Sequence, residues 1–304
     1  MQHLNHLSKS QQQGVLALIK AAHDFDGTPP IAEHVLLHLR HGGDKSDSHL
    51  VIEENNQVIA YAHLDATDLV AGPSVEAVVH PNHRSKGLGS LILKEAIKVC
   101  GDKTRIWSHG DLPDAKAIAA SLKLERIWSN LLMSKPLSEI QPVTSKYSIR
   151  TFIPDFDNQA FLSLNNKVFA SYPDQGGWSE DDLMVRLNES WFDEKGFFVA
   201  EDKDELIGFC WTKIHGAHTH SHSGEDEDHG HEALGEIYVL AVNPDYKGQG
   251  VGRDLTITGL NYLKYQGLNN VMLYVGVENK PAFNLYKSLG FNNFGSDVMY
   301  RVKG

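Results

Sequence analysis

Three glycines and a basic residue follow an apolar stretch late in the chain, at a spacing that suits phosphate binding. Residues 235–253 read GEIYVLAVNPDYKGQGVGR, with Gly248, Gly250 and Gly252 at alternate positions. Residues 237–242 are apolar and β-branched enough for a buried strand, and the Asn-Pro-Asp after them ends it. Helical periodicity begins after the glycines, and the unpaired N–H groups at a helix N-terminus attract anions. The segment therefore predicts a strand, a turn and a phosphate-binding helix N-terminus.

Neither of two common phosphate loops fits this segment. A Walker A loop ends in Gly-Lys-Ser or Gly-Lys-Thr, whereas this loop ends in Gly252-Arg253-Asp254. A dinucleotide-binding loop has the spacing G-x-G-x-x-G near the start of a βαβ unit, and here G-x-G-x-G lies deep in the chain. The pattern that fits is a basic residue, two residues and Gly-x-Gly, beginning at Lys247. It resembles the pyrophosphate loop of the GCN5-related N-acetyltransferase (GNAT) family, where the basic position is usually Arg or Gln.

The same pattern occurs a second time in the chain. Residues 76–89 read EAVVHPNHRSKGLG, so Arg84, Gly87 and Gly89 stand where the later copy has its basic residue and two glycines. An amphipathic helical pattern follows both copies. A glycine-loop motif that occurs twice, each time followed by a helical pattern, indicates an internal duplication. The resemblance then implies an α+β fold of two tandem GNAT domains, each a mixed, mostly antiparallel sheet flanked by helices.

The expected elements have the same order in both halves. Helices are expected at 11–25, 31–40, 88–99, 114–122, 155–169, 179–187, 251–265 and 280–289. Strands are expected at 49–54, 57–64, 75–79, 105–108, 124–133, 147–152, 196–201, 206–214, 237–242, 271–277 and 291–302. Residues 135–148, KPLSEIQPVTSKYS, lack apolar periodicity and read as a linker. We therefore expect an N-terminal domain at 1–140 and a C-terminal catalytic domain at 141–304.

Composition places the chain among soluble globular proteins. Of its 304 residues 41% are hydrophobic and 22% charged, and no apolar run approaches the roughly 20 residues that span a bilayer. The first residues lack the pattern of a signal peptide. A net charge of −11 argues against a nucleic-acid partner. Cys100 and Cys210 lie in apolar patterns and read as small buried thiols. We expect a cytoplasmic monomer with no membrane contact.

A segment rich in histidine separates two expected strands of the second half. Residues 215–231 and their neighbours read HGAHTHSHSGEDEDHGHEA, with almost nothing to bury. The first interpretation is a solvated insertion at a hairpin tip. The alternative is a metal site, because alternating histidines can bind zinc or nickel. No metal is assigned to the chain on this pattern.

Acetyl transfer from a thioester to an amine needs a base, a polarised carbonyl and an acid for the leaving thiolate. In this family backbone N–H groups of the strand before the loop, here 240–242, polarise the carbonyl, and a β-bulge splays that strand. Glu236 at the strand's start is the candidate base, and alternation predicts that it shares a face with Tyr238 and Leu240. Tyr286, two turns after the expected helix cap Asn279, is the candidate acid.

The first half lacks these two groups at the corresponding places. Sliding back through the glycine loops puts Pro73 opposite Glu236, and sliding back through the next helix puts Ala119 opposite Tyr286. Neither Pro nor Ala can exchange a proton. We infer that the first half binds CoA without catalysing, and the alternative is that it uses other residues, such as His80 or Glu76.

A closer resemblance covers nearly the whole chain. The strings YPDQGGW at 172–178, GFCWTK at 208–213 and GEIYV at 235–239, together with the degenerate first half, are similar to the mycothiol synthase family. These enzymes transfer acetyl from acetyl-CoA to the cysteinyl amine of cysteinyl-glucosaminyl-inositol, a pseudodisaccharide. Alternatives are a GNAT acetyltransferase for another amine or a protein N-terminus, and a non-catalytic acetyl-CoA sensor.

The resemblance also implies roles for single residues. Catalysis falls to Glu236 and Tyr286, and substrate contact to Glu33, Asp174, Lys213, Glu236 and Tyr274. Asp174 stands where the family usually has Glu, so its reach is shorter. Acetyl-CoA in the second half would contact Leu240, Ala241, Val242, Lys247, Gly248, Gln249, Gly250, Val251, Gly252, Arg253, Asn279, Lys280, Pro281, Ala282, Phe283 and Asn284. A second CoA in the first half would contact Val78, Val79, His80, Arg84, Gly87 and Gly89.

Overall fold

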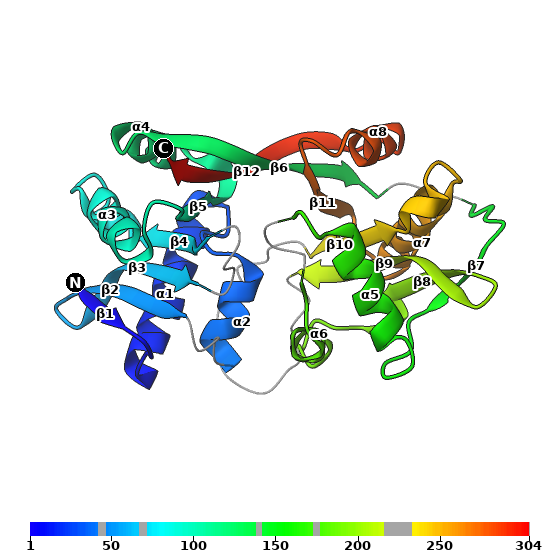
Figure 1. Ribbon diagram of the computed structural model, residues 1–304, viewed down its shortest axis with the longest axis horizontal. Coiled ribbons are helices and arrows are strands. Elements are labelled where there is room, and N and C mark those ends of the chain that lie inside the picture. The colour runs from blue at the N-terminus through cyan, green and yellow to red at the C-terminus, as the bar shows by residue number, and fades with distance from the viewer. Residues whose placement is uncertain (42–46, 67–71, 138–141, 173–176, 216–232, 304) are drawn as a thin grey trace. The chain divides into compact units, whose positions relative to one another are not determined.

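The computed structural model describes residues 1–41, 47–66, 72–137, 142–172, 177–215 and 233–303, and it divides into two compact units (Figure 1). Unit 1 comprises Met1–Leu131, Gly276–Glu278 and Gly295–Gly304, and unit 2 comprises Leu132–Val275 and Asn279–Phe294. The last segment of the chain therefore completes unit 1. Both units are sheets with helices packed against them, as expected for the α+β fold.

Unit 1 begins with a short strand that the sequence analysis did not anticipate. Its elements are β1 (Gln2–Leu4), α1 (Lys9–Asp26), α2 (Glu33–His41), β2 (Ser48–Glu54), β3 (Gln57–Asp65), β4 (Ser74–Val79), α3 (Leu88–Cys100), β5 (Arg105–Ser108), α4 (Pro113–Ser121) and the start of β6 (Leu124–Pro136). Helix α1 starts at a capping box formed by Ser8 and Gln11 and ends at Gly27, which is left-handed with φ of 66°. Asn55 and Asn56 both have positive φ in the β2–β3 turn, as a two-residue hairpin requires.

Unit 2 repeats this order. Its elements are the end of β6, β7 (Ser148–Thr151), α5 (Asn158–Val168), α6 (Glu180–Leu187), β8 (Phe197–Asp202), β9 (Glu205–His215), β10 (Leu234–Val242), α7 (Val251–Tyr265), β11 (Asn270–Gly276), α8 (Lys280–Ser288) and the start of β12 (Asn292–Val302). Its main core is aromatic: the rings of Phe197 and Trp211 stack with centroids 4.4 Å apart, and Phe152 stacks on Phe197 at 4.1 Å. Burial of such large rings dominates the energetics of a core.

The strand order is β1-β2-β3-β4-β5 in unit 1, and β12 pairs with β5 through Val298–Arg301. In unit 2 it is β11-β10-β9-β8-β7. Two parallel pairs lie where the glycine loops begin. Strand β4 pairs with β5 only from Ser74 to Glu76, although it continues to Val79. Strand β10 pairs with β11 only from Gly235 to Ile237, although it continues to Val242. Each sheet therefore opens between two strands just before its glycine loop.

The elements expected from the sequence are present in both units, within a few residues at their ends. Among the residues that the structure describes, no helix is both long and apolar enough to cross a membrane. Both cysteines are free thiols, and Cys210 is fully buried.

Candidate functional site

The glycine loop of unit 2 presents open backbone N–H groups at the start of α7. Gly248 and Gly250 have φ of 77° and 90°, which favours glycine, and Gly250 is the N-cap of α7 with no side-chain cap. A Cβ on Gly252 would lie 3.4 Å from the Val242 side chain, so the loop packs closely on the strand before it. Lys247 is exposed beside the loop. Uncapped amides next to a cation suit a pyrophosphate.

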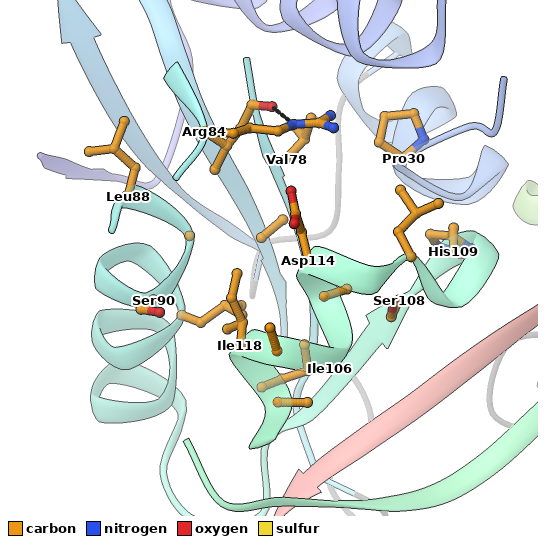
Figure 2. Close-up of a pocket in the computed structure, with 18 of the residues that line it drawn as sticks. Pro30, Val78, Arg84, Leu88, Ser90, Ile106, Ser108, His109, Asp114 and Ile118 are labelled. Carbon is orange, nitrogen blue, oxygen red and sulfur yellow. Dashed lines mark hydrogen bonds between the residues drawn. The ribbon is translucent and has the colours of Figure 1, made fainter. Parts of the chain in front are cut away.

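The loop of unit 1 has the same geometry. Gly87 has φ of 82° and is the uncapped N-cap of α3. A Cβ on Gly89 would lie 2.7 Å from Ile118. Unlike Lys247, the basic residue is held in place: the guanidinium of Arg84 donates to both carboxylate oxygens of Asp26, at 2.7 and 2.6 Å. Its Nε also donates to the Val79 carbonyl at 3.2 Å, so Arg84 is fixed at the edge of the loop (Figure 2).

A cavity of about 390 Å³ lies in unit 1 between the separated strands β4 and β5 (Figure 2). Strand β4 contributes Val78 and Val79, strand β5 contributes Ile106 to Ser108, and the glycine loop contributes Gly87 and Gly89. Figure 2 shows the carboxylate of Asp114 pointing toward Arg84, and Leu88, Ser90 and Ile118 on the helices around the cavity. An apolar slot that opens at helix amides and an arginine has the shape and polarity to hold an apolar arm ending in phosphate. Of the six first-half residues assigned to CoA, only His80 is not part of the cavity lining.

The backbone of β10 changes face at Tyr238. Its register with β9 shifts between Ile237 and Val239, which marks an irregularity of the β-bulge type. Leu240 is paired with Cys210, whose Sγ lies against Gly259 of α7. The expected bulge is present, but two residues earlier than 240–242.

This change of face corrects one expectation. Glu236 is paired with Lys213, and Tyr238 packs on the aromatic core with Val239 and Ala241. Leu240 faces α7 instead, so it does not share the face of Glu236. Simple alternation fails here because the bulge adds one residue to the strand.

Glu236 is buried and held by a histidine that the sequence analysis did not select. The side chain is 6% exposed, and its Oε2 lies 2.6 Å from Nε2 of His215 at the end of β9. The pairing of Glu236 with Lys213 brings the end of β9 beside it. The hairpin register could have identified His215, but the intervening histidine-rich segment hid that register. A buried carboxylate held by one partner can accept a proton from a nearby amine.

Tyr286 has the properties of a proton donor. It is 5% exposed, and its ring packs edge-on against Phe291. Burial, together with neighbouring Cys210 and Tyr172, raises the pKa of its hydroxyl above the usual value for tyrosine. The hydroxyl is therefore protonated at neutral pH, as a general acid must be. Asn279 is the N-cap of α8, as expected, and its amide donates to Tyr172 at 3.1 Å.

The remaining residues assigned to substrate contact differ in environment. Lys213 is 9% exposed and its ammonium lies 4.2 Å from the centre of the Trp191 ring and 5.3 Å from that of Tyr238. Tyr274 on β11 is 38% exposed. Glu33 is the first residue of α2 in unit 1. Asp174 and residues 216–232 lie outside the described residues.

The positions of Glu236 and Tyr286 carry other residue types in unit 1, and one of them differs from the residue expected from the sequence. The same backbone hydrogen bond follows β4 and β10, so the two strands can be compared position by position. Because β10 has the extra residue, Ser74 rather than Pro73 corresponds to Glu236. Ser74 has no carboxylate, and Ala119 is buried in α4 with nothing to donate. The inference about unit 1 is unchanged.

The two alternative residues of unit 1 are in different environments. His80 is partly exposed, and its ring accepts from the Asn82 N–H. Glu76 is buried and held through one oxygen: Nε2 of His109 lies 3.2 Å from its Oε2, and the Ala32 N–H donates to the same oxygen at 2.5 Å. Burial opposes the charge of Glu76, but His109 and His34 bring its pKa down to about 2. A carboxylate held as an anion this firmly is a poor base.

Comparisons with known proteins match both halves of the chain. The Acetyltransferase (GNAT) family matches residues 17–124 and 163–291, one segment in each half. The mycothiol acetyltransferase of Acidothermus cellulolyticus is 45% identical over 95% of this chain and 90% of its own length. That of Thermomonospora curvata is 42% identical over 97% of this chain and 95% of its own.

Solved structures show the same fold at low identity. A tandem GNAT protein from the clavulanic acid biosynthesis pathway superposes with a TM-score of 0.67 at 17% identity, covering 96% of this chain and 95% of that one. A GCN5-related N-acetyltransferase from Sphaerobacter thermophilus superposes with a TM-score of 0.63 at 19% identity, covering 95% and 91%.

Proposed function

Because the chain belongs to the mycothiol acetyltransferases of the GNAT family, we propose that it transfers acetyl from acetyl-CoA to the cysteinyl amine of cysteinyl-glucosaminyl-inositol, the last step of mycothiol biosynthesis, in unit 2. One observation carries the assignment of chemistry to unit 2. Both units keep the glycine loop and the opened strand pair, but only unit 2 has a buried carboxylate and a buried tyrosine at the corresponding places.

The pyrophosphate of acetyl-CoA would bind the uncapped amides of 248–252 and Lys247. The pantetheine arm would pair with the free edge of β10 beyond Ile237, where β11 no longer pairs with it. The remaining contacts proposed for this half are Asn279–Asn284 at the start of α8, a helix whose first turn is capped by its own Asn279 side chain.

The chemistry then follows from the side chains of unit 2. Glu236 takes a proton from the substrate ammonium, directly or through a water, and the neutral nitrogen attacks the thioester carbon. Backbone N–H groups of 240–242 stabilise the oxyanion that forms. The C–S bond breaks as the carbonyl re-forms, and Tyr286 donates its proton to the leaving thiolate. The nitrogen loses its second proton at the same stage, which restores the Tyr286 hydroxyl through solvent, and Glu236 releases the first proton to water.

The groups around Glu236 suit a polyhydroxylated substrate. Lys213 and Tyr274 offer a cation and a hydroxyl on β9 and β11, and the buried Glu236 itself can accept from the substrate. Asp174 and Glu33 remain proposed contacts. A cysteinyl α-amine has a pKa near the usual ~7.7–8, so the base has to remove only one readily released proton at neutral pH.

Unit 1 is proposed to bind a second CoA without catalysis. Support comes from its cavity, its uncapped α3 N-terminus and the fixed Arg84. Such a ligand stabilises unit 1 by mass action and does not enter the reaction.

We further propose that the enzyme acts as a cytoplasmic monomer without nucleic acid. Both loops belong to one chain, and Cys100 and Cys210 are free thiols, as a reducing compartment favours. Light scattering of the purified chain tests the monomer, and a dimer mass would exclude it.

The function is tested by thiol release from acetyl-CoA with cysteinyl-glucosaminyl-inositol set against a panel of plain amines, an aminoglycoside and a peptide N-terminus. We expect kcat/KM for the pseudodisaccharide to exceed that of each other amine by at least about a hundredfold, because several polar contacts are lost with a plain amine. Equal rates across the panel would favour a broad amine acetyltransferase. No thiol release with any amine would favour a sensor.

A further inference from the structure

Two histidines and an aspartate meet inside unit 1, and none of them lines its cavity or belongs to its glycine loop. Nδ1 of His38 on α2 lies 2.8 Å from Oδ2 of Asp47, just before β2. Nε2 of His63 on β3 lies 3.7 Å from the same oxygen. One ligand-type atom from each of the three residues lies within 4.8 Å of the others. No other group of three or more His, Cys, Asp or Glu side chains among the described residues is close enough to hold a metal ion.

His63 is buried with one ring nitrogen left without a hydrogen bond. It is 1% exposed, and its Nε2 makes no hydrogen bond. A neutral imidazole with an open lone pair binds metal, whereas a buried imidazole nitrogen without a partner costs stability. The other ring nitrogen, Nδ1, lies 3.4 Å from the hydroxyl of Tyr61.

Tyr61 connects this nitrogen to a further histidine. The Tyr61 hydroxyl is also 2.8 Å from Nδ1 of His49. A histidine that binds a metal through one nitrogen is usually oriented by a hydrogen bond on the other. The Tyr61 hydroxyl can therefore fix the ring of His63 with Nε2 turned toward Asp47.

The equivalent place in unit 2 shows that the fold does not need polar groups here. The backbone bond from His80 to Ile59 in unit 1 corresponds to the bond from Asn243 to Ile207 in unit 2. Each residue of β3 can therefore be matched with a residue of β9 by counting from Ile59 and Ile207. The positions of His49, Tyr61 and His63 carry Phe197, Phe209 and Trp211 in unit 2. Those three belong to the aromatic core of unit 2, in which Phe197 stacks on Trp211. Unit 1 thus has two imidazole rings and a phenol at positions where the same fold in unit 2 has apolar rings.

We propose that His38, Asp47 and His63 bind a divalent transition metal ion of the zinc class. Metal–ligand bonds of about 2.0–2.2 Å in a tetrahedral site place ligand atoms roughly 3.3 Å apart. The separations of 2.8 and 3.7 Å bracket that value. Three protein ligands leave one position for water, and two imidazoles with one carboxylate suit zinc, cobalt or iron(II).

The ligands come from three separate elements, so the metal has a structural effect. His38 lies on α2, Asp47 at the start of β2 and His63 on β3. A metal would tie α2 to the sheet of unit 1 and offset the burial of the two imidazoles and the carboxylate. The cavity and its glycine loop lie on other elements, apart from β4 beside β3, so metal removal should leave CoA binding largely intact.

Binding can be tested in the full chain with the histidine-rich segment silenced. His218, His220, His222, His229 and His231 are changed to Asn, because alternating histidines bind metal by themselves. This background is stripped with chelator and titrated with Co²⁺, followed by visible absorption, and with Zn²⁺, followed by calorimetry and thermal unfolding. Variants His38→Gln, Asp47→Asn and His63→Gln are made in it. His83→Gln, another histidine of unit 1 outside the cluster, is the matched control.

We expect one equivalent of metal in the background and in His83→Gln, with a rise in Tm of about 5 °C at a hundredfold excess over Kd. Each cluster variant should weaken metal binding at least tenfold and lose that rise. His38→Gln is the most informative, because His38 is partly exposed and its replacement leaves the core packed. Metal bound equally in all variants, or no metal bound by the folded background, would overturn the proposal.

Discussion

Glu236→Gln is the sharpest test of the catalytic assignment. The substitution keeps the size of the side chain and its contact with His215 but removes the negative charge. Glu236 is 6% exposed, so bulk water has little access to replace it as the base. Loss of a positioned base lowers rates by about 10²–10⁴, or roughly 2.7–5.4 kcal/mol in the activation barrier.

The pKa of the substrate amine shows where in the 10²–10⁴ range the rate loss of Glu236→Gln should fall. At pH 7 about one sixth of an amine with a pKa of ~7.7 is already neutral, and at pH 9 nearly all of it is. A variant without the base depends on that fraction, so its rate should rise about sixfold between pH 7 and 9. The defect in kcat is therefore expected near 10²–10³ at pH 7 and smaller at pH 9.

The assay is thiol release under saturating acetyl-CoA, with acetyl-CoA affinity measured separately by calorimetry. Glu205→Gln is the control, since Glu205 is an exposed glutamate on the same strand as His215. His215→Gln should give a smaller loss than Glu236→Gln, and the double variant should be little worse than Glu236→Gln alone. A Glu236→Gln enzyme within twofold of the parent, with acetyl-CoA still bound, would refute the assignment of the base.

Three further results follow from the structure. Tyr286→Phe should lower kcat by about 10²-fold with acetyl-CoA affinity unchanged, because the ring still packs on Phe291 while the proton donor is lost; an unchanged kcat would exclude it as the acid. Gly87→Ala, at φ of 82°, should cost about 1–2 kcal/mol of stability and reduce bound CoA from two equivalents to one, with turnover within about twofold. Gly250→Ala should instead raise KM for acetyl-CoA. Calorimetry measures the bound equivalents, and kinetics measures turnover and KM. Burial opposes the charge of Asp157, but hydrogen bonds from Arg150 and the Ile153 N–H lower its pKa. The stability that its charge contributes is therefore present above pH ~3.9 and lost as pH falls through the lower folded pKa. In urea unfolding between pH 2 and 6, the free energy of unfolding of Asp157→Asn should fall less with acid than that of the parent.

The features read correctly from the sequence are those in which residue type determines the backbone. Gly87 and Gly250 have positive φ, and few other residues tolerate that conformation. Their spacing therefore predicted two loops, two helix starts and the duplication, and the family match at 17–124 and 163–291 confirms the tandem architecture. Asn279 was likewise identified as a helix cap from its type and place.

The features that were missed depend on pairing between distant strands. A bulge at Tyr238 has no composition of its own, so alternation put Leu240 on the wrong face. For the same reason, sliding back through the glycine loops put Pro73 rather than Ser74 opposite Glu236. The contact of His215 with Glu236 arises only once β9 and β10 are in register. The order of expected elements shows which strands are neighbours but not which residues face each other.

The two units show that one backbone can support different interiors. The glycine loop and the opened strand pair depend on backbone conformation, so both units retain them whatever their cores contain. Catalysis depends on side chains placed beside that opening, and these differ. Unit 2 combines Glu236 and Tyr286 with an aromatic core packed on its strands. Unit 1 has histidine and aspartate on that same face of the sheet, which removes apolar packing and leaves an open imidazole nitrogen on His63. The proposed metal would offset part of the cost of burying these polar groups, and its binding would not depend on what unit 2 catalyses.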